Sequence, residues 1–480
     1  MAVTRRNVLI GAGAGVGAGV VAAGGAAALL DDGIPADPSS LVRVDALPRD
    51  DASPGWFHTS RVRQPKAPLI GDDKAPWVVI GAGFTGLAAA RQLALNFPQD
   101  KVILVEAQQV GFGTSGRNAG FLIDVPHDIG APDYIGDKAN ARNVLHLNQR
   151  GQGILRDLVA EHNIVDAHLR PSGKYQAAIE DEGIAVLNAY RGGLEALGEK
   201  VQLIEGDELK EHIGTSFYRK ALYTPGTMLV QPSALVKGLA DSLPENVTLY
   251  EDTVITAVDY GQKIVLHHPT GRITADKLIL GNNHFGQHFG FLENRMLPIF
   301  TYGSLTRPLT ASEQASIGGQ PFWGVIPADP FGSTLRRTHD NRILVRNSFS
   351  FNPDGRSKDG YTDKVRAAHR LSFERRFPTL TDVPFEHTWG GGLGMTRNGA
   401  GFFGELRENV YGALACNGLG TVRGTATGTL LANLLAGKKE PLTDFLLSAP
   451  KPNWNPPQPM LSIGVNFTLR TGQAKAGMEA

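Results

Sequence analysis

The apolar pattern is clearest in residues 77–106. A continuous apolar run at 77–80 leads into a glycine-rich turn, and an alanine-rich stretch follows at 87–94. Such a run is typical of a buried parallel strand, and the alanines favour a helix. A second apolar run at 101–105 ends in Glu106. The pattern predicts a strand, a tight turn, a helix and a second strand, packed as one α/β unit.

Other apolar runs predict a second unit that is rich in strands. Residues 298–306 alternate between polar and apolar positions, as a half-buried antiparallel strand does. Residues 173–178, 333–337 and 342–345 also have the composition of strands, and residues 186–209 predict a helix, a connection and the start of another helix. The fold class we expect is α/β (α+β mixed), with a Rossmann-like domain interrupted by a mixed antiparallel-sheet domain.

The turn at residues 81–86 has the spacing G-x-G-x-x-G. Gly81 permits the turn out of the strand, Gly83 lets a pyrophosphate approach the backbone, and Gly86 lets the helix pack on the strand. Glu106 follows by about twenty residues, where an acid binds the hydroxyls of an unphosphorylated ribose. A tight turn without a ligand is the alternative, but the whole unit favours a dinucleotide. The expected contacts are Gly81, Ala82, Gly83, Phe84, Thr85, Gly86, Glu106 and Ala107.

A second glycine-rich stretch, at residues 11–25, lacks both this spacing and a preceding strand. It lies in an uncharged segment, residues 8–30, that follows two adjacent arginines and resembles a twin-arginine export signal. We therefore expect a periplasmic or exported protein. A membrane anchor, which would give membrane association through the N-terminus, and a mobile tail are the alternatives. Residues 31–75 are rich in Pro, Asp and Ser and predict a linker or a surface arm, with the folded core beginning at Pro76.

Composition restricts the classes of function. Of 480 residues, 42% are hydrophobic and 20% are charged, and the formal net charge is zero. This composition is typical of a globular protein, and the charge balance argues against nucleic acid as a partner. The single cysteine, Cys416, excludes an intrachain disulfide and a cysteine-rich metal site. His, Cys and Asp residues do not cluster at metal-site spacing, so we expect no metal.

A second glycine-rich polar loop, residues 111–121, follows Glu106 closely and contains Ser-Gly-Arg-Asn at 115–118. Far along the chain, Trp-Gly-Gly stands at 389–391. Together with the preceding unit, these motifs resemble the D-amino-acid-oxidase-like family of FAD-dependent oxidoreductases, and most nearly its gamma-glutamylputrescine oxidase branch. Thr114 and Ala119 depart mildly from the family's version of the loop.

The resemblance extends to the end of the cofactor site. Asn-Val-Tyr at 409–411 and Asn-Gly-Leu-Gly at 417–420 match elements that complete the FAD site in the family, and a helix is expected at 425–436. Residues 251–254 resemble the strand that contacts adenine, and 278–282 the strand and loop that return to the cofactor. The resemblance implies further FAD contacts at Gly113, Thr114, Ser115, Gly116, Arg117, Asn118, Ala119, Val254, Asn282, Gly418, Leu419, Gly420 and Thr421.

The resemblance also implies a flavin-centred reaction. Hydride transfer from an amine or amino acid to FAD would give an imine that water hydrolyses, and oxygen would accept the electrons to give hydrogen peroxide. Two alternatives stay open: a dehydrogenase that uses a membrane quinone or carrier, and a partner-modifying or non-catalytic flavoprotein. Arg117 stands where some relatives have a flavin-linking His, and Met395 and Thr396 stand where others have a linking Cys, so we expect non-covalent FAD.

Substrate contacts are expected mainly from the second domain. The resemblance places Arg336 and Arg337 where related amino-acid oxidases have an arginine for the substrate carboxylate, and a surface charge pair on a strand is the alternative. Tyr302, His284 and Trp389 are candidate pocket walls, or else packed core residues.

The expected organisation has five parts. They are a signal or anchor at 1–30, a linker or arm at 31–75, an FAD-binding domain at 76–170, 221–285 and 386–442, a substrate domain at 171–220 and 286–385, and a C-terminal tail at 443–480.

Overall fold

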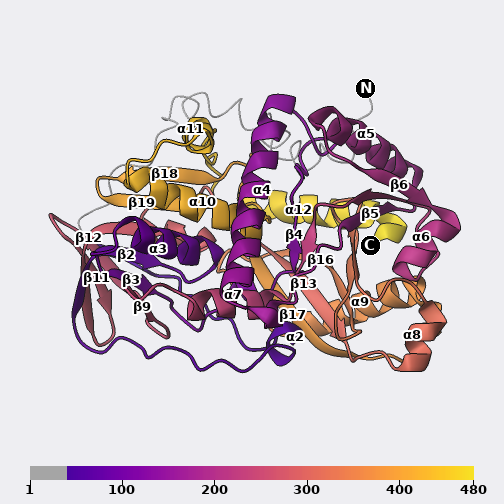
Figure 1. Ribbon diagram of the computed structural model, residues 1–480, viewed down its shortest axis with the longest axis horizontal. Helices are drawn as coiled ribbons and strands as arrows, with labels where there is room; N and C mark the ends of the chain where they lie inside the picture. The colour runs from indigo at the N-terminus through magenta and orange to yellow at the C-terminus, as the bar shows by residue number, and fades with distance from the viewer. Residues whose placement is uncertain (1–40) are drawn as a thin grey trace.

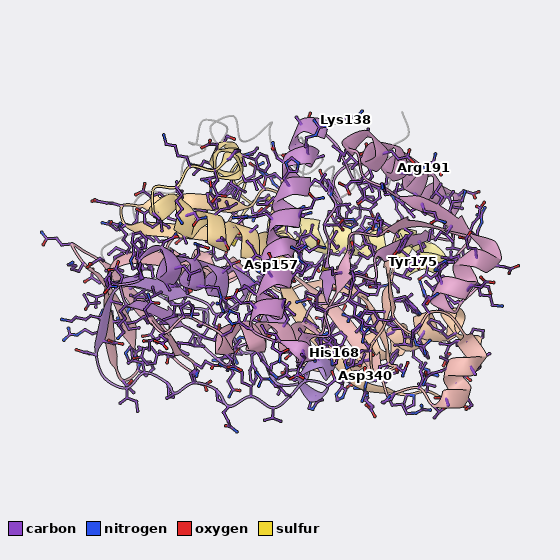
Figure 2. All side chains as sticks on the ribbon, in the orientation of Figure 1. Lys138, Asp157, His168, Tyr175, Arg191 and Asp340 are labelled. Atoms are coloured by element: carbon purple, nitrogen blue, oxygen red, sulfur yellow. The ribbon has the colours of Figure 1, made fainter. Side chains whose placement is uncertain are left out.

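The computed structural model describes residues 41–480, so the predicted export signal or anchor lies outside the described residues. The chain builds two large β-sheets, and helix α4 (Lys138–Glu161) crosses the middle of the molecule (Figure 1). Figure 2 marks Lys138 at one end of this helix and Asp157 towards the other. Within residues 41–480, no helix is both long and apolar enough to cross a bilayer.

The first sheet is built around the predicted nucleotide-binding unit. β2 (Asp73–Ile80) and β3 (Val102–Val105) are parallel neighbours joined through α3 (Phe84–Asn96), which confirms the predicted strand, turn, helix and strand. β2 begins at Asp73 rather than at Pro76, because its first residues pair with a neighbouring strand. In spatial order the strands are β1 (Leu41–Arg43), β10 (Ala257–Tyr260), β11 (Ile264–His268), β12 (Gly271–Leu280), β2, β3 and β9 (Val247–Tyr250), while β19 (Val410–Leu414), paired with β18 (Phe402–Arg407), also joins β12.

Helices cover one face of this sheet. α3 packs on α10 (Gly420–Leu435), which begins earlier than the helix predicted from residue 425. Apolar side chains of α3, α7 (Pro232–Asp241), α10 and the parallel strands form one continuous core. The expectation of a strand at 251–254 is wrong: β9 ends at Tyr250 and the backbone turns at Asp252, whose φ is +48°.

The second sheet is mixed, mostly antiparallel, and contains every strand predicted for the second unit. It also contains β6 (Gln202–Glu205), which the helical interpretation of residues 186–209 missed. It takes in β7 (Lys220–Thr224) and β17 (Phe385–Met395) as well, so the expected domain boundaries at 221 and 386 shift. Pairing partners far away in sequence decide where these strands belong. In spatial order the strands are β17 (Phe385–Met395), β13 (Leu297–Thr306), β16 (Ile343–Phe351), β15 (Thr334–Arg337), β14 (Trp323–Pro327), β5 (Lys174–Ala178), β7 (Lys220–Thr224) and β6 (Gln202–Glu205).

The two terminal segments are packed into this frame. The arm adds β1 to the first sheet, and its short helix α2 (Gly55–His58) buries Trp56. The C-terminal segment forms α12 (Met460–Lys475), which packs on β16. Its last turn is held where the Glu479 carboxylate accepts hydrogen bonds from the backbone N–H groups of Ile179 and Asp329. The remaining helices are α5 (Asp181–Leu197), α6 (Gly206–Ile213), α8 (Ala311–Ile317), α9 (Tyr361–Arg376) and α11 (Pro441–Ser448), and a two-stranded ribbon pairs β4 (Phe121–Leu122) with β8 (Met228–Leu229).

Candidate active site

A cavity of about 1330 Å³ lies between the two sheets and is lined by residues of both. Ordinary ligand pockets measure roughly 300–1,000 Å³, so this cavity has room for more than one small ligand. The arm and α12 also contribute to its wall. The cavity therefore joins the predicted dinucleotide site to the second sheet.

The G-x-G-x-x-G turn and Glu106 form one end of the cavity. Gly81 has a φ of +95°, which permits the turn out of β2, and a Cβ on Gly86 would lie 1.8 Å from the carbonyl oxygen of Gly81. The Glu106 carboxylate accepts hydrogen bonds from the backbone N–H groups of Ala82, at 2.9 Å, and Gln108, at 3.1 Å. Burial raises the pKa of Glu106, and these two hydrogen bonds oppose the rise. This geometry holds an acceptor for ribose hydroxyls beside the turn.

The second glycine-rich loop lies beside the first. The backbone N–H of Phe84, at the start of α3, donates to the hydroxyl of Ser115 at 3.3 Å. The side chain of Asn118 accepts from Gly120 N and donates to the carbonyl oxygen of Ser115, which fixes the loop. Arg117 also lines the cavity, but its guanidinium donates to backbone carbonyls of the protein, among them Gly390.

The turn before α10 also forms part of the cavity wall at the cofactor end. Residues 418–421 line the cavity, and Asn417 anchors the turn by accepting a hydrogen bond from Thr396 N at 2.9 Å. Because α10 starts at this turn, its N-terminus presents free N–H groups and partial positive charge there. Cys416 also lines the cavity, and burial raises the pKa of its thiol, which disfavours the thiolate needed for a covalent bond.

Two side chains of the cavity wall have buried polar atoms without a hydrogen-bond partner among residues 41–480. Asn282, just after β12, has an unpaired Oδ1, and His284 has two unpaired ring nitrogens. Burial lowers the pKa of His284 to about 4, so its imidazole is neutral at pH 7. Buried polar atoms usually have hydrogen-bond partners, so these atoms favour a bound polar ligand. Tyr302 also lines the cavity, and its hydroxyl pairs with that of Ser350 at 2.8 Å.

Most of the predicted cofactor residues line this cavity, and three do not. Ala82, Gly86 and Gly116 lie behind its surface, where Ala82 binds Glu106 and the two glycines allow close backbone packing. The cavity wall contains Gly81, Gly83, Phe84, Thr85, Glu106, Ala107, Gly113, Thr114, Ser115, Arg117, Asn118, Ala119, Val254, Asn282, Gly418, Leu419, Gly420 and Thr421.

Of the four substrate candidates, Tyr302 and His284 line the cavity, whereas Trp389 and Arg336 do not. Trp389 packs against Trp56 and donates from Nε1 to the carbonyl oxygen of Arg117 at 3.0 Å. Arg336 is fully buried and donates to the carbonyl oxygens of Ala119, Gly120 and Val230.

Arg337 is likewise outside the cavity wall and donates to the carbonyl oxygens of Gly318 and Gln320. Arg346 on β16 lines the cavity, as do Arg117, Arg397 and Arg423, and the sequence interpretation missed it as a substrate candidate. The sequence marked Arg346 only as the single charged residue in the segment 343–351.

A family model described as FAD dependent oxidoreductase matches residues 76–434. The chain belongs to this family. It is 27% identical over 373 residues to the gamma-glutamylputrescine oxidoreductase of Escherichia coli (strain K12), an alignment that covers 76% of this chain and 85% of the relative. It is also 27% identical over 419 residues to a probable oxidoreductase, OrdL, of Rhizobium meliloti (strain 1021), covering 81% and 90% of the two chains.

Solved structures share the fold. The glycine oxidase of Geobacillus kaustophilus superposes with a TM-score of 0.65 at 20% identity, covering 78% of this chain and 99% of that one. The L-amino acid deaminase of Proteus myxofaciens superposes with a TM-score of 0.62 at 17% identity, covering 79% and 94%. The predicted family and fold class are therefore confirmed, and FAD is the cofactor of this oxidoreductase.

The residues at the site fit FAD. Glu106 offers carboxylate oxygens for the ribose, and the two glycine-rich loops together with the N-terminus of α3 would hold the pyrophosphate. The unpaired Oδ1 of Asn282 and the turn at 418–421 would contact the rest of the cofactor. Within residues 41–480, no three His, Cys, Asp or Glu side chains are grouped as metal ligands.

Proposed function

We propose that this protein oxidises the C–N bond of an amino acid, or of an amine that carries a carboxylate, with FAD as cofactor and oxygen as electron acceptor. One observation supports a carboxylate on the substrate: Arg346 faces the cavity without a hydrogen bond or ion pair to any described residue. A half-buried guanidinium without a counter-ion is disfavoured, so this arrangement favours an anionic ligand. The relative named gamma-glutamylputrescine oxidoreductase supports a substrate that contains an amine.

Arg346 is held at the centre of the second sheet. Thr334 and Gly303 are its cross-strand partners, and both line the cavity. The guanidinium carbon lies 5.3 Å from the ring centroid of Phe349, which supports the cation from one side. Burial lowers the pKa of Arg346 to about 10, so the side chain is still charged at neutral pH. A carboxylate could therefore form a bidentate pair with it.

The protein would orient the substrate for a reaction at the cofactor. When bound, FAD supplies an acceptor for the hydride on the carbon next to the substrate nitrogen. Arg346 would fix the carboxylate end, while Tyr302 and the neutral imidazole of His284 would contact the remainder. The imine product reacts with water to give a carbonyl compound and ammonia or an amine. Two electrons and two protons then reduce one oxygen molecule to hydrogen peroxide.

Anaerobic reduction tests the proposal. Purified holoprotein is mixed with amino acids and with the corresponding amines that lack the carboxylate, and loss of the oxidised-flavin absorbance is recorded. We expect amino acids to bleach the flavin faster, and we expect air to restore the colour with one hydrogen peroxide formed for each substrate consumed. Slow reoxidation by air but fast reoxidation by a quinone would instead assign a dehydrogenase. Failure of every amine and amino acid to bleach the flavin would contradict the proposal and favour a partner-modifying role.

We also propose export through the twin-arginine segment, because a folded, FAD-loaded protein suits a pathway that carries folded cargo. Replacing both arginines at positions 5 and 6 by lysine should keep the protein in the cytoplasmic fraction. If the unaltered protein is found in the membrane fraction with its full length, the anchor alternative holds instead.

A further inference from the structure

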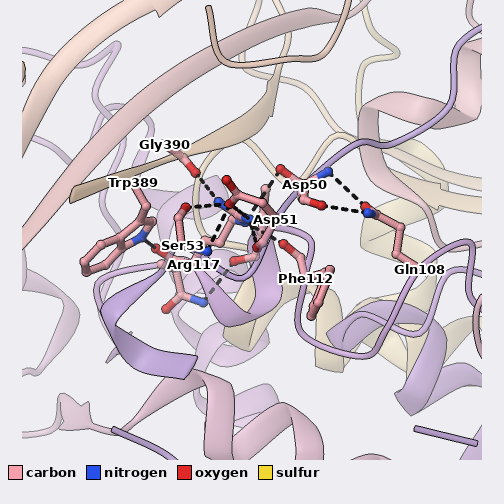
Figure 3. Close-up of polar contacts among 10 residues, drawn as sticks. Asp50, Asp51, Ser53, Gln108, Phe112, Arg117, Trp389 and Gly390 are labelled. Atoms are coloured by element: carbon pink, nitrogen blue, oxygen red, sulfur yellow. Dashed lines mark hydrogen bonds and ion pairs between the residues drawn. The ribbon is translucent and has the colours of Figure 1, made fainter. Parts of the chain in front are cut away.

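One stretch of the cavity wall comes from outside the family match, which begins at residue 76. Residues 44–51, called here the strap, supply part of the wall at the cofactor end of the cavity. Figure 3 shows the polar contacts of its last two residues, Asp50 and Asp51. Their lining members are mainly apolar, which suits contact with a flat aromatic base. The lining residues of the strap are Val44, Ala46, Leu47, Pro48 and Asp50.

The strap is anchored on both sides of the cavity. Before it, β1 pairs with β10, and Val44 N donates to the carbonyl oxygen of Thr256 at 2.9 Å. After it, Trp56 is 1% exposed and donates from its indole nitrogen to the carbonyl oxygen of Asn118 at 2.8 Å. The strap therefore runs between two fixed points of the fold.

Gln108 joins the strap to the ribose acid. Its side chain accepts from Asp50 N at 3.0 Å and donates to the carbonyl oxygen of Asp50 at 2.7 Å. Its backbone N–H donates to the carboxylate of Glu106. One continuous set of hydrogen bonds therefore runs from the strap to the group that binds the ribose.

Arg117 joins the strap to the rest of the site, as Figure 3 shows. Its guanidinium donates to the carbonyl oxygen and to Oδ1 of Asp51, the latter at 3.0 Å, and also to the carbonyl oxygens of Phe112 and, on β17, Gly390. Asp50 adds an ion pair, with Oδ1 at 3.6 Å from Nε of Arg117. Arg117 is buried, so these contacts are shielded from solvent.

We propose that residues 44–51 close over the adenosine half of bound FAD, that Gln108 and Arg117 are positioning residues that hold this strap shut, and that FAD leaves only when the strap lifts. The rate of FAD release then follows the opening of the strap rather than the contacts of the glycine-rich loops alone. The strap therefore belongs to the cofactor site although it lies outside the family match.

Gln108→Leu tests the inference, because it removes both strap hydrogen bonds and keeps the backbone contact to Glu106. We expect FAD to dissociate about tenfold faster, as the loss of two ordinary hydrogen bonds predicts, measured by the rise of free-flavin fluorescence after dilution. Arg61→Ala is the matched control. It removes the ion pairs of the arm to Asp166 and Asp241, away from the cavity wall, and should leave the release rate unchanged.

Hydrogen exchange on the unaltered protein gives a second readout that needs no variant. We expect the amides of residues 44–53 to exchange more slowly in the FAD-loaded protein than in the full-length protein stripped of FAD. Equal exchange in the two forms would overturn the inference. So would an unchanged release rate in folded Gln108→Leu protein. Both readouts are independent of the substrate, so they can fail while the proposed amine oxidation stands.

Discussion

Replacing Arg346 by methionine separates a substrate-binding arginine from a structural one. Methionine keeps an unbranched chain of similar length but removes the charge and every donor. Because Arg346 makes no hydrogen bond or ion pair with a described residue, the substitution leaves no protein acceptor unpaired. Any loss of activity then reports a contact with the substrate.

The substitution should change both the activity and the stability of the protein, and each change can be given a magnitude. A hydrogen-bonded contact to a charged group contributes about 1.5–3 kcal/mol, so kcat/KM for a carboxylate-bearing substrate should fall by roughly 10- to 150-fold. Burial lowers the pKa of Arg346 to about 10, and a lowered pKa means that the folded state disfavours the cation. Removing this buried charge should therefore raise the free energy of unfolding at pH 7 by on the order of 1–3 kcal/mol. The variant should be less active and more stable.

Two assays check this combination. Steady-state kinetics compare one amino acid with the amine that lacks its carboxylate, and thermal unfolding of the FAD-loaded protein gives Tm. Arg336→Met is the kinetic control: Arg336 lies outside the cavity wall and donates to backbone carbonyl oxygens, so the preference for the carboxylate should stay the same. Equal losses on both substrates in Arg346→Met, or a lower Tm, would refute the assignment of Arg346.

Three further outcomes follow from the site. Gly86→Ala places a Cβ 1.8 Å from the carbonyl oxygen of Gly81, so the purified protein should contain little FAD, as its ratio of flavin to protein absorbance would show. Burial lowers the pKa of His284 to about 4, so between pH 6.5 and 4 only the unfolded chain binds a proton at this residue. The free energy of unfolding therefore falls as the pH falls through that range, by up to about 3 kcal/mol. Urea unfolding at pH 7 and pH 4.5 should show a smaller loss of this free energy for His284→Gln than for the unaltered protein. Acid precipitation should leave the yellow colour in the supernatant, because burial keeps the Cys416 thiol protonated, and colour retained in the pellet would show a covalent flavin.

The cofactor end was predictable because its signals are local. The turn at 81–86, the strands around it and Glu106 fall within a short stretch of chain, where each residue's task follows from its neighbours. Strands such as β13 were predictable from alternation alone. Neither signal depends on which distant strand becomes the partner.

The position of Arg346 at the cavity was not predictable from the sequence. Alternation tells which face of a strand a residue lies on, but not where along the sheet that residue lies. Thr334 and Arg336 are two residues apart on β15 and point to the same face. Thr334 reaches the cavity, whereas Arg336 lies under the loop at Ala119 and Gly120. The strand register pairs Thr334 with Arg346 and so places Arg346 at the cavity. That register depends on the whole sheet.

The arm and the C-terminal segment were underestimated for a related reason. Residues 44–51 have no periodic pattern, because Gln108 and Arg117, which hold Asp50 and Asp51, are 58 and 66 residues away in sequence. A segment without periodicity looks like a linker even when side chains far along the chain satisfy its backbone groups.

The C-terminal helix has a consequence for substrate preference. The family match ends at residue 434, yet Leu461 and Val465 of α12 line the cavity and pack against an apolar cluster that includes Phe331. Because α12 packs on β16, the strand of Arg346, a substrate held by that arginine would meet the apolar wall of α12. The glycine-rich turns that bind the cofactor lie within the family match, whereas α12 lies outside it. Substrate preference within the family should therefore vary with the residues of α12 more than with those of the glycine-rich loops.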